Sequence, residues 1–165
     1  MTKLVIDSEK YFEQIYERNV DTVYKVCFIY LKGNKANVED AVQTTFLQML
    51  KKKMIFDSES HEKAWFITVA SNTCKNMLKR KHNRNVSLDE YQIDVSSDDN
   101  NSSADVLEAL FNLPDKYKQI IYMHYYEGYS GVEISKMLGI KENTIYSYLS
   151  KGRELLKNEL KEDFI

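Results

Sequence analysis

Glycine and proline are scarce along the whole chain, which has five glycines and one proline among its 165 residues. Average globular proteins contain about 12% of these two residues together. Because glycine and proline mark turns and interrupt helices, their scarcity argues against turn-rich β sandwiches and against Pro/Gly-rich disordered chains. The sequence therefore predicts an all-α protein.

Apolar residues recur at helical spacing in three segments of the first half. Spacings of three and four predict helices over about residues 8–31, 37–52 and 62–82. We expect Gly33 to end the first helix and Asn37 to cap the second. These segments predict an N-terminal bundle of three to four helices.

Charge is unevenly distributed, although the formal net charge is −2. Residues 61–84 carry a net charge of +5, and residues 85–105 carry −6. The acidic segment is rich in Ser and Asn and has too few apolar residues to offset the entropy of ordering it. We therefore predict two small helical domains, residues 1–84 and 104–165, joined by an acidic flexible linker at 85–103.

The second domain has the sequence signals of a helix-turn-helix. Ser103 is expected to cap a short helix, and Pro114 to lie in the first turn of the next helix, which closes at Gly128. Ser130 and Glu133 form a capping box, after which Gly139 is expected to end a short helix. A longer helix follows from about residue 142 to 160. A short helix, a glycine turn and a longer helix predict a helix-turn-helix domain.

The start of the second helix in such a motif enters the DNA major groove. Its outward polar positions are Asn143, Thr144, Tyr146, Ser147, Tyr148, Ser150 and Lys151. An ordinary helical hairpin with a solvated face is the alternative. Residues 106–165 carry a net charge of −1, whereas DNA-binding proteins gain much of their affinity by neutralising phosphates. We therefore expect the isolated domain to bind DNA weakly. Binding becomes useful when a larger assembly holds the domain near its site.

The basic end of the third predicted helix has a different potential role. Trp65 and five Lys or Arg residues between positions 75 and 84 could hold single-stranded nucleic acid by stacking and charge. Burial of Trp65 in the core is the alternative.

No motif in the sequence indicates catalysis. The three histidines lie in different elements, Cys-x-x-Cys does not occur, and no nucleophile is paired with a base in a recognisable motif. We expect no enzyme, no metal and no cofactor. The longest apolar run, residues 26–31, is far below the roughly 20 residues that span a bilayer. We therefore expect a cytoplasmic protein with no membrane insertion and with Cys27 and Cys74 reduced.

Three blocks of residues follow one another along the chain and together carry a family resemblance. The first is residues 38–47 (VEDAVQTTFL) and the second is residues 64–72 (AWFITVASN). The third spans residues 113–149 and includes LPDKY, YYEGYS and TIYSYL. Together they resemble the extracytoplasmic-function (ECF) group of sigma factors, the promoter-recognition subunits of bacterial RNA polymerase.

The resemblance implies a role for each block. The first would dock on the polymerase clamp, the second would melt and capture the start-proximal promoter box, and the third would read the upstream box. Implied polymerase contacts are Glu39, Asp40, Gln43, Thr44, Phe46 and Gln48. Implied start-proximal DNA contacts are Trp65, Thr68, Ser71, Asn72, Lys75, Asn76, Lys79 and Arg80. Implied upstream DNA contacts are Ser130, Asn143, Thr144, Tyr146, Ser147, Tyr148 and Lys151.

The partners implied by the resemblance are core RNA polymerase, promoter DNA and an inhibitory anti-sigma factor. The chain departs from the family pattern at five positions. Ser71 stands where Arg is usual, Asn76 where Asp is common, Tyr148 and Lys151 where Arg is frequent, and Gly152 where Ala is usual. The resemblance therefore implies the role of a promoter-recognition subunit, but it does not indicate which promoter sequence the chain reads. A stand-alone helix-turn-helix regulator and a sigma-like polymerase adaptor that reads no promoter are the alternative functions.

Overall fold

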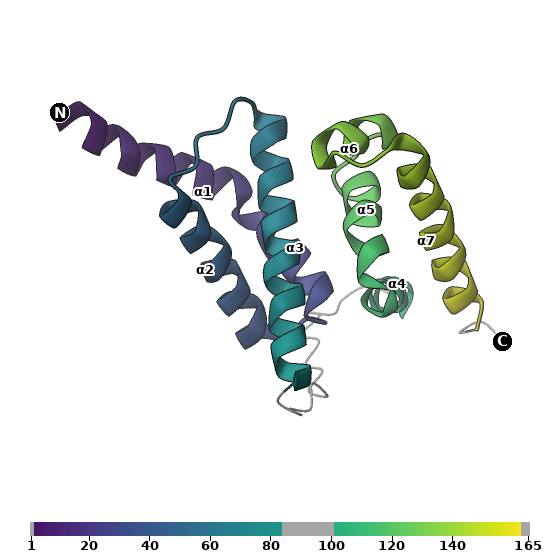
Figure 1. The fold of residues 1–165 in the computed structure, drawn as a ribbon. Helices are drawn as coiled ribbons and strands as arrows, with labels where there is room; N and C mark the ends of the chain where they lie inside the picture. Colours follow the sequence, from purple (N-terminus) through teal and green to yellow (C-terminus); the bar gives the residue numbers. More distant parts are fainter. Residues whose placement is uncertain (1, 84–100, 163–165) are drawn as a thin grey trace.

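The computed structural model describes residues 2–83 and 101–162, which contain seven α-helices and no strand. Three helices form an N-terminal group and four form a C-terminal group (Figure 1). The N-terminal helices are α1 (Thr2–Tyr30), α2 (Lys35–Lys52) and α3 (Glu59–Asn83). The C-terminal helices are α4 (Asn101–Asn112), α5 (Asp115–Tyr125), α6 (Gly131–Leu138) and α7 (Glu142–Glu162). The predicted all-α fold with two helical domains is confirmed.

The N-terminal helices pack around an apolar core to which each of them contributes. Val23 of α1, Phe46 of α2, and Phe66 and Ile67 of α3 are buried. The ring centroids of Phe46 and Phe66 are 5.1 Å apart, which is a normal spacing for an aromatic pair. The apolar stripes seen in the sequence thus become the contacts between α1, α2 and α3.

A polar contact fixes the start of α3 against α1. Arg18 Nε and Nη2 donate to the two carboxylate oxygens of Glu62 at 3.1 and 2.9 Å. Asn19 Nδ2 donates to Glu62 Oε1 at 2.6 Å and to the Ile15 carbonyl at 2.8 Å. Burial by itself would raise the pKa of Glu62, but the hydrogen bonds from Arg18 and Asn19 outweigh it, so the pKa lies below the ordinary value.

The C-terminal helices pack closely where α5 meets α7. Gly152 of α7 is buried, and a Cβ atom at this position would lie 2.7 Å from Ile121 Cδ1 and 2.8 Å from Ile121 Cγ1. Glycine in a helix interior costs about 1 kcal/mol relative to alanine. The family pattern usually has Ala at this position. Packing explains the glycine of this chain, because it leaves room for Ile121.

Several predicted helix ends are wrong. Asn34, and not Asn37, caps α2, because Gly33 adopts a left-handed φ of +72° just before it and Asn34 Oδ1 accepts from the Asn37 amide at 3.1 Å. Residue 103 lies inside α4, which begins at Asn101. Pro114 occupies the N-cap position of α5, which ends at Tyr125 before the turn at Gly128.

The third helix also begins earlier than predicted, at Glu59. Ser58 Oγ accepts a hydrogen bond from the His61 amide at 3.1 Å, and the Ser58 carbonyl accepts from the Glu62 amide at 3.0 Å. These contacts satisfy amide groups of the first turn, which have no partner within the helix.

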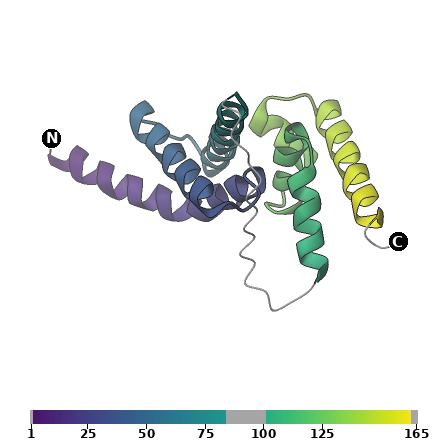
Figure 2. The ribbon, with the colours of Figure 1, turned by 90° about the horizontal axis from the view of Figure 1, so that it is seen from below.

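The two groups of helices lie side by side. In Figures 1 and 2, α5 and α6 run next to α3, and α1 reaches α4 and α5. The ring centroids of Phe28 in α1 and Phe111 in α4 are 5.8 Å apart. Most of the predicted linker at 85–103 lies outside the described residues, while residues 101–103 belong to α4.

Candidate nucleic-acid and partner surfaces

The helix-turn-helix has the local geometry that the sequence predicted. Ser130 Oγ accepts from the Glu133 amide at 3.1 Å, and Glu133 Oε1 accepts from the Ser130 amide at 3.1 Å. Gly139 ends α6 in a left-handed conformation with a φ of +67°. The capping box and the glycine turn are therefore confirmed, and together they set α6 against the start of α7.

The predicted upstream DNA residues on α7 fall on its outer side. Ile145 and Leu149 point into the core, with 0% and 3% of their surface exposed. Thr144 and Tyr148 are half-buried. The predicted DNA residues whose side chains are exposed are Ser130, Asn143, Tyr146, Ser147 and Lys151. This alternation leaves hydrogen-bonding groups available to a groove of DNA.

Two tyrosines of α7 are held in place by neighbours that the sequence analysis missed. The ring of Tyr146 lies against Gly131, where a Cβ atom would be 2.7 Å from Tyr146 Cε1. Tyr148 packs edge-on against Tyr117 with centroids 5.4 Å apart, and Lys116 Nζ lies 5.9 Å above the Tyr148 ring. A glycine directly after the helix cap at Ser130 was a sequence signal for a close neighbour at position 131. The contact between Tyr148 and Tyr117 joins two separate helices, so no local sequence pattern indicates it.

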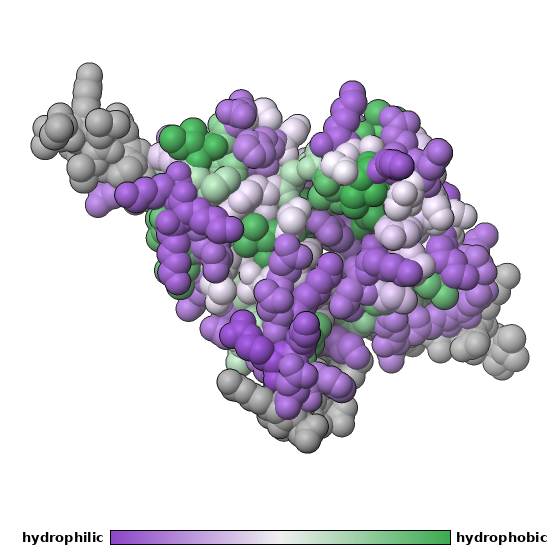
Figure 3. Space-filling view, viewed as in Figure 1, coloured by the Kyte–Doolittle hydropathy of each residue, from purple (hydrophilic) through white to green (hydrophobic). Residues whose placement is uncertain are grey.

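The predicted start-proximal residues of α3 separate into an exposed and a covered set. Asn72, Asn76, Lys79 and Arg80 are exposed, and hydrophilic side chains gather over the lower part of α3 in Figure 3. Thr68 is half-buried, and its Oγ1 accepts from Gln119 Nε2 at 3.3 Å. Ser71 is fully buried. Ser71 is therefore inaccessible to DNA in this arrangement, while the basic end of α3 is open.

Trp65 belongs to an aromatic cluster at the start of α3. It is half-buried, and its ring lies 5.6 Å from that of Phe56 and 5.0 Å from that of Phe66, both nearly edge-on. Lys75 is also half-buried, with Nζ 5.9 Å from the Tyr30 ring. Trp65 thus combines core packing with a partly open ring.

The predicted polymerase contacts lie on α2 beside an apolar groove. Glu39, Asp40 and Gln43 are exposed, whereas Thr44 and Gln48 are half-buried. Thr44 Oγ1 donates to the Asp40 carbonyl at 2.9 Å. Phe46 lines this groove but is only 4% exposed, so most of its ring is packed in the core.

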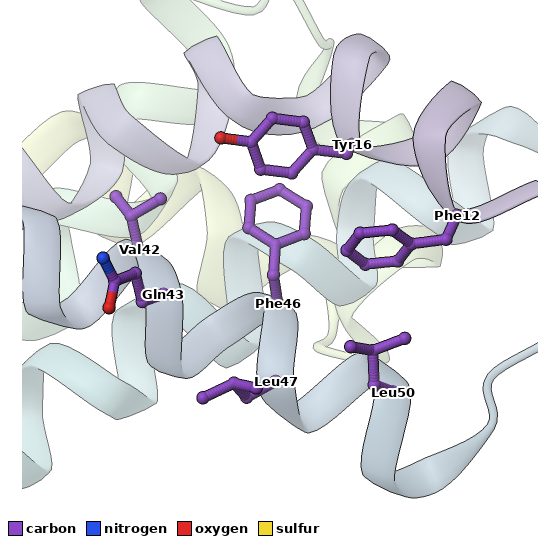
Figure 4. Close-up of a pocket in the computed structure, with 7 residues that line it drawn as sticks. All are labelled: Phe12, Tyr16, Val42, Gln43, Phe46, Leu47 and Leu50. Atoms are coloured by element: carbon purple, nitrogen blue, oxygen red, sulfur yellow. The ribbon is translucent and has the colours of Figure 1, made fainter. Parts of the chain in front are cut away.

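The groove itself has a volume of about 310 Å³ (Figure 4). Phe12 and Tyr16 of α1 converge on Phe46, with the Tyr16 and Phe46 centroids 4.7 Å apart. Leu47 and Leu50 of α2 line it and are 52% and 49% exposed. Leu47 is the last residue of the first motif block but was not among the implied polymerase contacts, and Leu50 lies outside that block. Their spacing of three on the polar side of a predicted helix was a usable signal.

Among the described residues, no group of three or more His, Cys, Asp or Glu side chains is placed to hold a metal ion. No helix in this part of the chain is long and apolar enough to cross a membrane.

Two family models match the chain. The model described as sigma-70 region 2 matches residues 15–84, and the model described as sigma-70, region 4 matches residues 103–156. The ECF RNA polymerase sigma factor SigL of Mycobacterium tuberculosis is 30% identical over 156 residues, covering 90% of this chain and 88% of SigL. The chain therefore belongs to the sigma-70 family.

A second relative, the ECF RNA polymerase sigma factor SigE of Mycolicibacterium smegmatis, is 26% identical over 159 residues. The match covers 90% of this chain and 61% of the length of SigE. Within the sigma-70 family, the chain belongs to the ECF group of RNA polymerase sigma factors.

A solved structure shares the fold. The sigma factor RpoE from Bartonella quintana, crystallised in complex with the anti-sigma factor NepR, superposes with a TM-score of 0.69 at 24% sequence identity. The superposition covers 92% of this chain and 98% of that one.

Proposed function

We propose that this protein is a promoter-specificity subunit, which binds core RNA polymerase and directs transcription to particular promoters. The observation that carries the proposal is the presence, in one chain of the ECF group, of two separate surfaces suited to nucleic acid. One is the exposed polar side of α7 behind the capped α6. The other is the exposed basic end of α3.

The proposed division of labour follows the two groups of helices. Residues 1–84 bind polymerase and melt the start-proximal promoter box, and residues 104–165 read the upstream box. The acidic stretch at residues 85–100 connects them in the chain. The polymerase supplies the catalysis, in the cytoplasm, and this chain contributes recognition alone, so no cofactor is involved.

The apolar groove between α1 and α2 is the proposed polymerase contact. Exposed leucines cost free energy in water, and a partner helix that covers them recovers roughly 25 cal/mol per Å² of apolar surface. Glu39 and Asp40 lie on the same helix and are exposed, so they provide a charged rim that fixes orientation.

A charge placed in the groove tests this contact. We expect Leu47→Asp to weaken binding to core polymerase by at least tenfold, measured by pull-down or surface plasmon resonance. Ile55→Asp is the matched control, because Ile55 is also an exposed apolar residue, at 79%, and does not line the groove. Equal binding by the two variants would remove the groove from the polymerase interface.

Promoter recognition is tested by transcription. We expect run-off transcripts from a library of random promoters when core polymerase is combined with this chain, and none from core polymerase alone. Gel retention of the selected promoters should require core polymerase. Tight, specific duplex binding by the free chain at physiological salt would favour a stand-alone helix-turn-helix regulator, and polymerase binding without selected promoters would favour an adaptor.

An inhibitory anti-sigma factor is a further proposed partner, based on membership of the ECF group. Affinity purification of the chain from cells in which its target genes are silent should recover such a protein in stoichiometric amount. Recovery of core polymerase under those silent conditions would argue against sequestration.

A further inference from the structure

A lysine at the start of α5 lies beside α7. Lys116 is the second residue of α5 and is exposed. Its Nζ lies 5.0 Å from the centroid of the Tyr117 ring and 5.9 Å from that of the Tyr148 ring. These two rings meet edge-on, with centroids 5.4 Å apart and an interplanar angle of 86°. The ammonium group of Lys116 is therefore within cation–π range of two rings, one on α5 and one on α7.

Lys116 faces away from the N-terminal helices. Residues two apart on a helix are separated by about 200° around its axis. Lys116 and Lys118 therefore lie on nearly opposite sides of α5. Lys118 is buried, with Nζ 5.3 Å from the centroid of the Tyr30 ring of α1. Lys116 contacts only rings of the C-terminal helices among the described residues, so its surroundings belong to the helix-turn-helix domain.

The charge of Lys116 is not balanced by a carboxylate in the part of the chain that the structure describes. The ion pairs found there involve other cations. Lys151 of α7, by contrast, has its Nζ 3.6 Å from Glu154 Oε1, so part of its charge is balanced within the protein. A cation–π contact orients an ammonium group without neutralising it. Lys116 therefore keeps its positive charge available to an anion outside the protein.

Tyr148 places this ammonium group at one flank of the outer side of α7. Residues three and four apart share a side of a helix, so Thr144, Tyr148 and Lys151 form one row along α7. Tyr146 lies on the other flank, against Gly131 of α6. A recognition helix in the major groove has base edges in front of it and the phosphates of the two strands beside it. Lys116 lies on a flank, where phosphate and not a base edge is expected.

The position of Lys116 also bears on the departure from the family pattern at residue 148. The pattern frequently has Arg there, whereas this chain has Tyr. Tyr148 puts a ring in the place of a cation, and Lys116 returns a positive charge to within 5.9 Å of that ring. Residues 106–165 carry a net charge of −1, so a single unbalanced cation beside α7 is a large part of what the domain can offer to phosphate.

We propose that Lys116, oriented by the rings of Tyr117 and Tyr148, contacts a backbone phosphate at the edge of the upstream promoter box. This inference rests on the proposed function and adds a contact residue from α5 to the upstream DNA surface. Lys116 supplies affinity and fixes the register of α7 in the groove, while the start of α7 reads the bases. Tyr148 is a positioning residue, because it acts on DNA through Lys116.

Neutral phosphate analogues test the contact directly. Holoenzyme is assembled from core polymerase and the full chain, and is bound to a promoter from the run-off selection that carries one methylphosphonate at a time along the upstream box. Each analogue removes one negative charge from the DNA. We expect at least one position at which the analogue weakens binding of the parent several-fold but leaves binding of Lys116→Gln almost unchanged, because the partner charge is already absent. Equal losses for the two proteins at every position would overturn the contact.

Salt dependence gives a second measurement on unmodified DNA. The slope of log affinity against log salt concentration should fall in magnitude by about 0.9 for Lys116→Gln, which is the value for one phosphate contact on duplex DNA. A loss of about tenfold at low salt should therefore narrow to about threefold when the salt concentration is raised about fourfold. Lys116→Arg keeps the charge and the contact with the rings and should match the parent. An unchanged slope for Lys116→Gln would overturn the contact.

Lys157→Gln is the matched control for the loss of charge. Lys157 is an exposed lysine of the same domain, nine residues beyond Tyr148 and about 13 Å further along α7. Its substitution should leave the salt slope and the analogue profile as they are in the parent. The same changes for Lys157→Gln and Lys116→Gln would indicate a general effect of domain charge and would overturn a specific contact.

The orienting role of the ring is tested through Tyr148. Tyr148→Phe keeps the aromatic face and should retain the salt slope of the parent. Tyr148→Leu removes that face and lets Lys116 adopt other rotamers, so binding should weaken several-fold and the slope should fall. In the Lys116→Gln background, Tyr148→Leu should leave the slope where Lys116→Gln has already put it. A parental slope for Tyr148→Leu would overturn orientation by the ring, and urea denaturation checks that each variant is folded.

Failure of this contact is distinguishable from failure of the proposed function. A parent holoenzyme that selects and binds no promoter would refute the promoter role. A parent holoenzyme that binds its promoter, with Lys116→Gln equal to it in affinity, salt slope and analogue profile, would refute the contact alone. The selection from the random library gives the last measurement. Lys116→Gln should select the same upstream sequence as the parent, and a changed base preference would contradict a contact with phosphate.

Discussion

Alanine in place of Gly152 should destabilise the protein, although alanine is the better helix former. In an open helix interior, Gly→Ala stabilises by about 1 kcal/mol. At position 152 the added methyl group would lie 2.7 Å from Ile121 Cδ1, 2.8 Å from Ile121 Cγ1 and 3.6 Å from Tyr117 Cβ. Carbon atoms in ordinary contact are about 3.5–4.0 Å apart, so α5 and α7 must move or Ile121 must leave its rotamer.

The magnitude follows from these two opposing effects. Overpacking of a core by one carbon typically costs about 1–3 kcal/mol, and the gain in helix propensity offsets about 1 kcal/mol of it. We therefore expect Gly152→Ala to lower the free energy of unfolding by about 1 kcal/mol. For a chain of this length, that change lowers Tm by about 2–4 °C.

The assay is urea denaturation of the full chain, followed by circular dichroism. Ile121→Val removes Cδ1 and should cost about 0.5–1.5 kcal/mol alone, but less in the Gly152→Ala background, because it makes room for the new methyl group. The double-mutant cycle should give a favourable coupling of about 1 kcal/mol. An increase in stability for Gly152→Ala, or additive changes in the cycle, would refute the packing explanation of this glycine.

Three further predictions concern stability and DNA contacts. Glu62→Gln removes a carboxylate whose folded pKa is depressed, so its stabilisation is present above the ordinary Glu pKa of about 4.3 and is lost as the pH falls below it. Urea midpoints between about pH 6 and pH 3 should therefore fall less steeply for the variant than for the parent, and equal slopes would contradict the pKa. Ser130→Ala removes the hydroxyl that caps α6 and should lower the free energy of unfolding by about 1 kcal/mol. Ser150→Ala, at an exposed position of α7, should lower it by less than about 0.5 kcal/mol. Similar losses for the two variants would argue against the capping role of Ser130. Replacing Lys79 and Arg80 by Ala should slow open-complex formation more than it weakens polymerase binding. The slope of log affinity for single-stranded DNA against log salt concentration should fall in magnitude by about 0.7 per lost phosphate contact. An unchanged slope would remove these residues from the DNA surface.

Local sequence determined the helices and the caps that lie within them. The scarcity of glycine and proline and the regular apolar spacing predicted an all-α chain, because helix periodicity depends on residues three and four apart. The capping box at Ser130 and Glu133 and the turn at Gly139 were predicted correctly, since each involves residues within one turn. The misplaced caps at residues 37 and 103 show where that local information is weakest, because several neighbouring residues can serve as a cap and packing selects one.

The motifs indicated which residues have a role, but they did not indicate which of those side chains are accessible to a partner. Phe46 and Ser71 belong to motifs that imply contacts with polymerase and DNA, yet both side chains are buried. Leu47 and Leu50, which are exposed beside the groove, were not among the residues expected to contact polymerase. A helix wheel indicates which residues share a side, but the neighbouring helix decides which of them remain open.

Helix content, the helix-turn-helix, the charge pattern and the family resemblance were therefore available from the sequence alone, since all of them depend on residues close together in the chain. The fit of Gly152 against Ile121 and the joining of Glu127 to Thr22 and Lys63 were decided by tertiary structure. These contacts link residues that lie between 31 and 105 positions apart in the sequence. Their formation depends on how whole helices pack, and no local pattern encodes that distance.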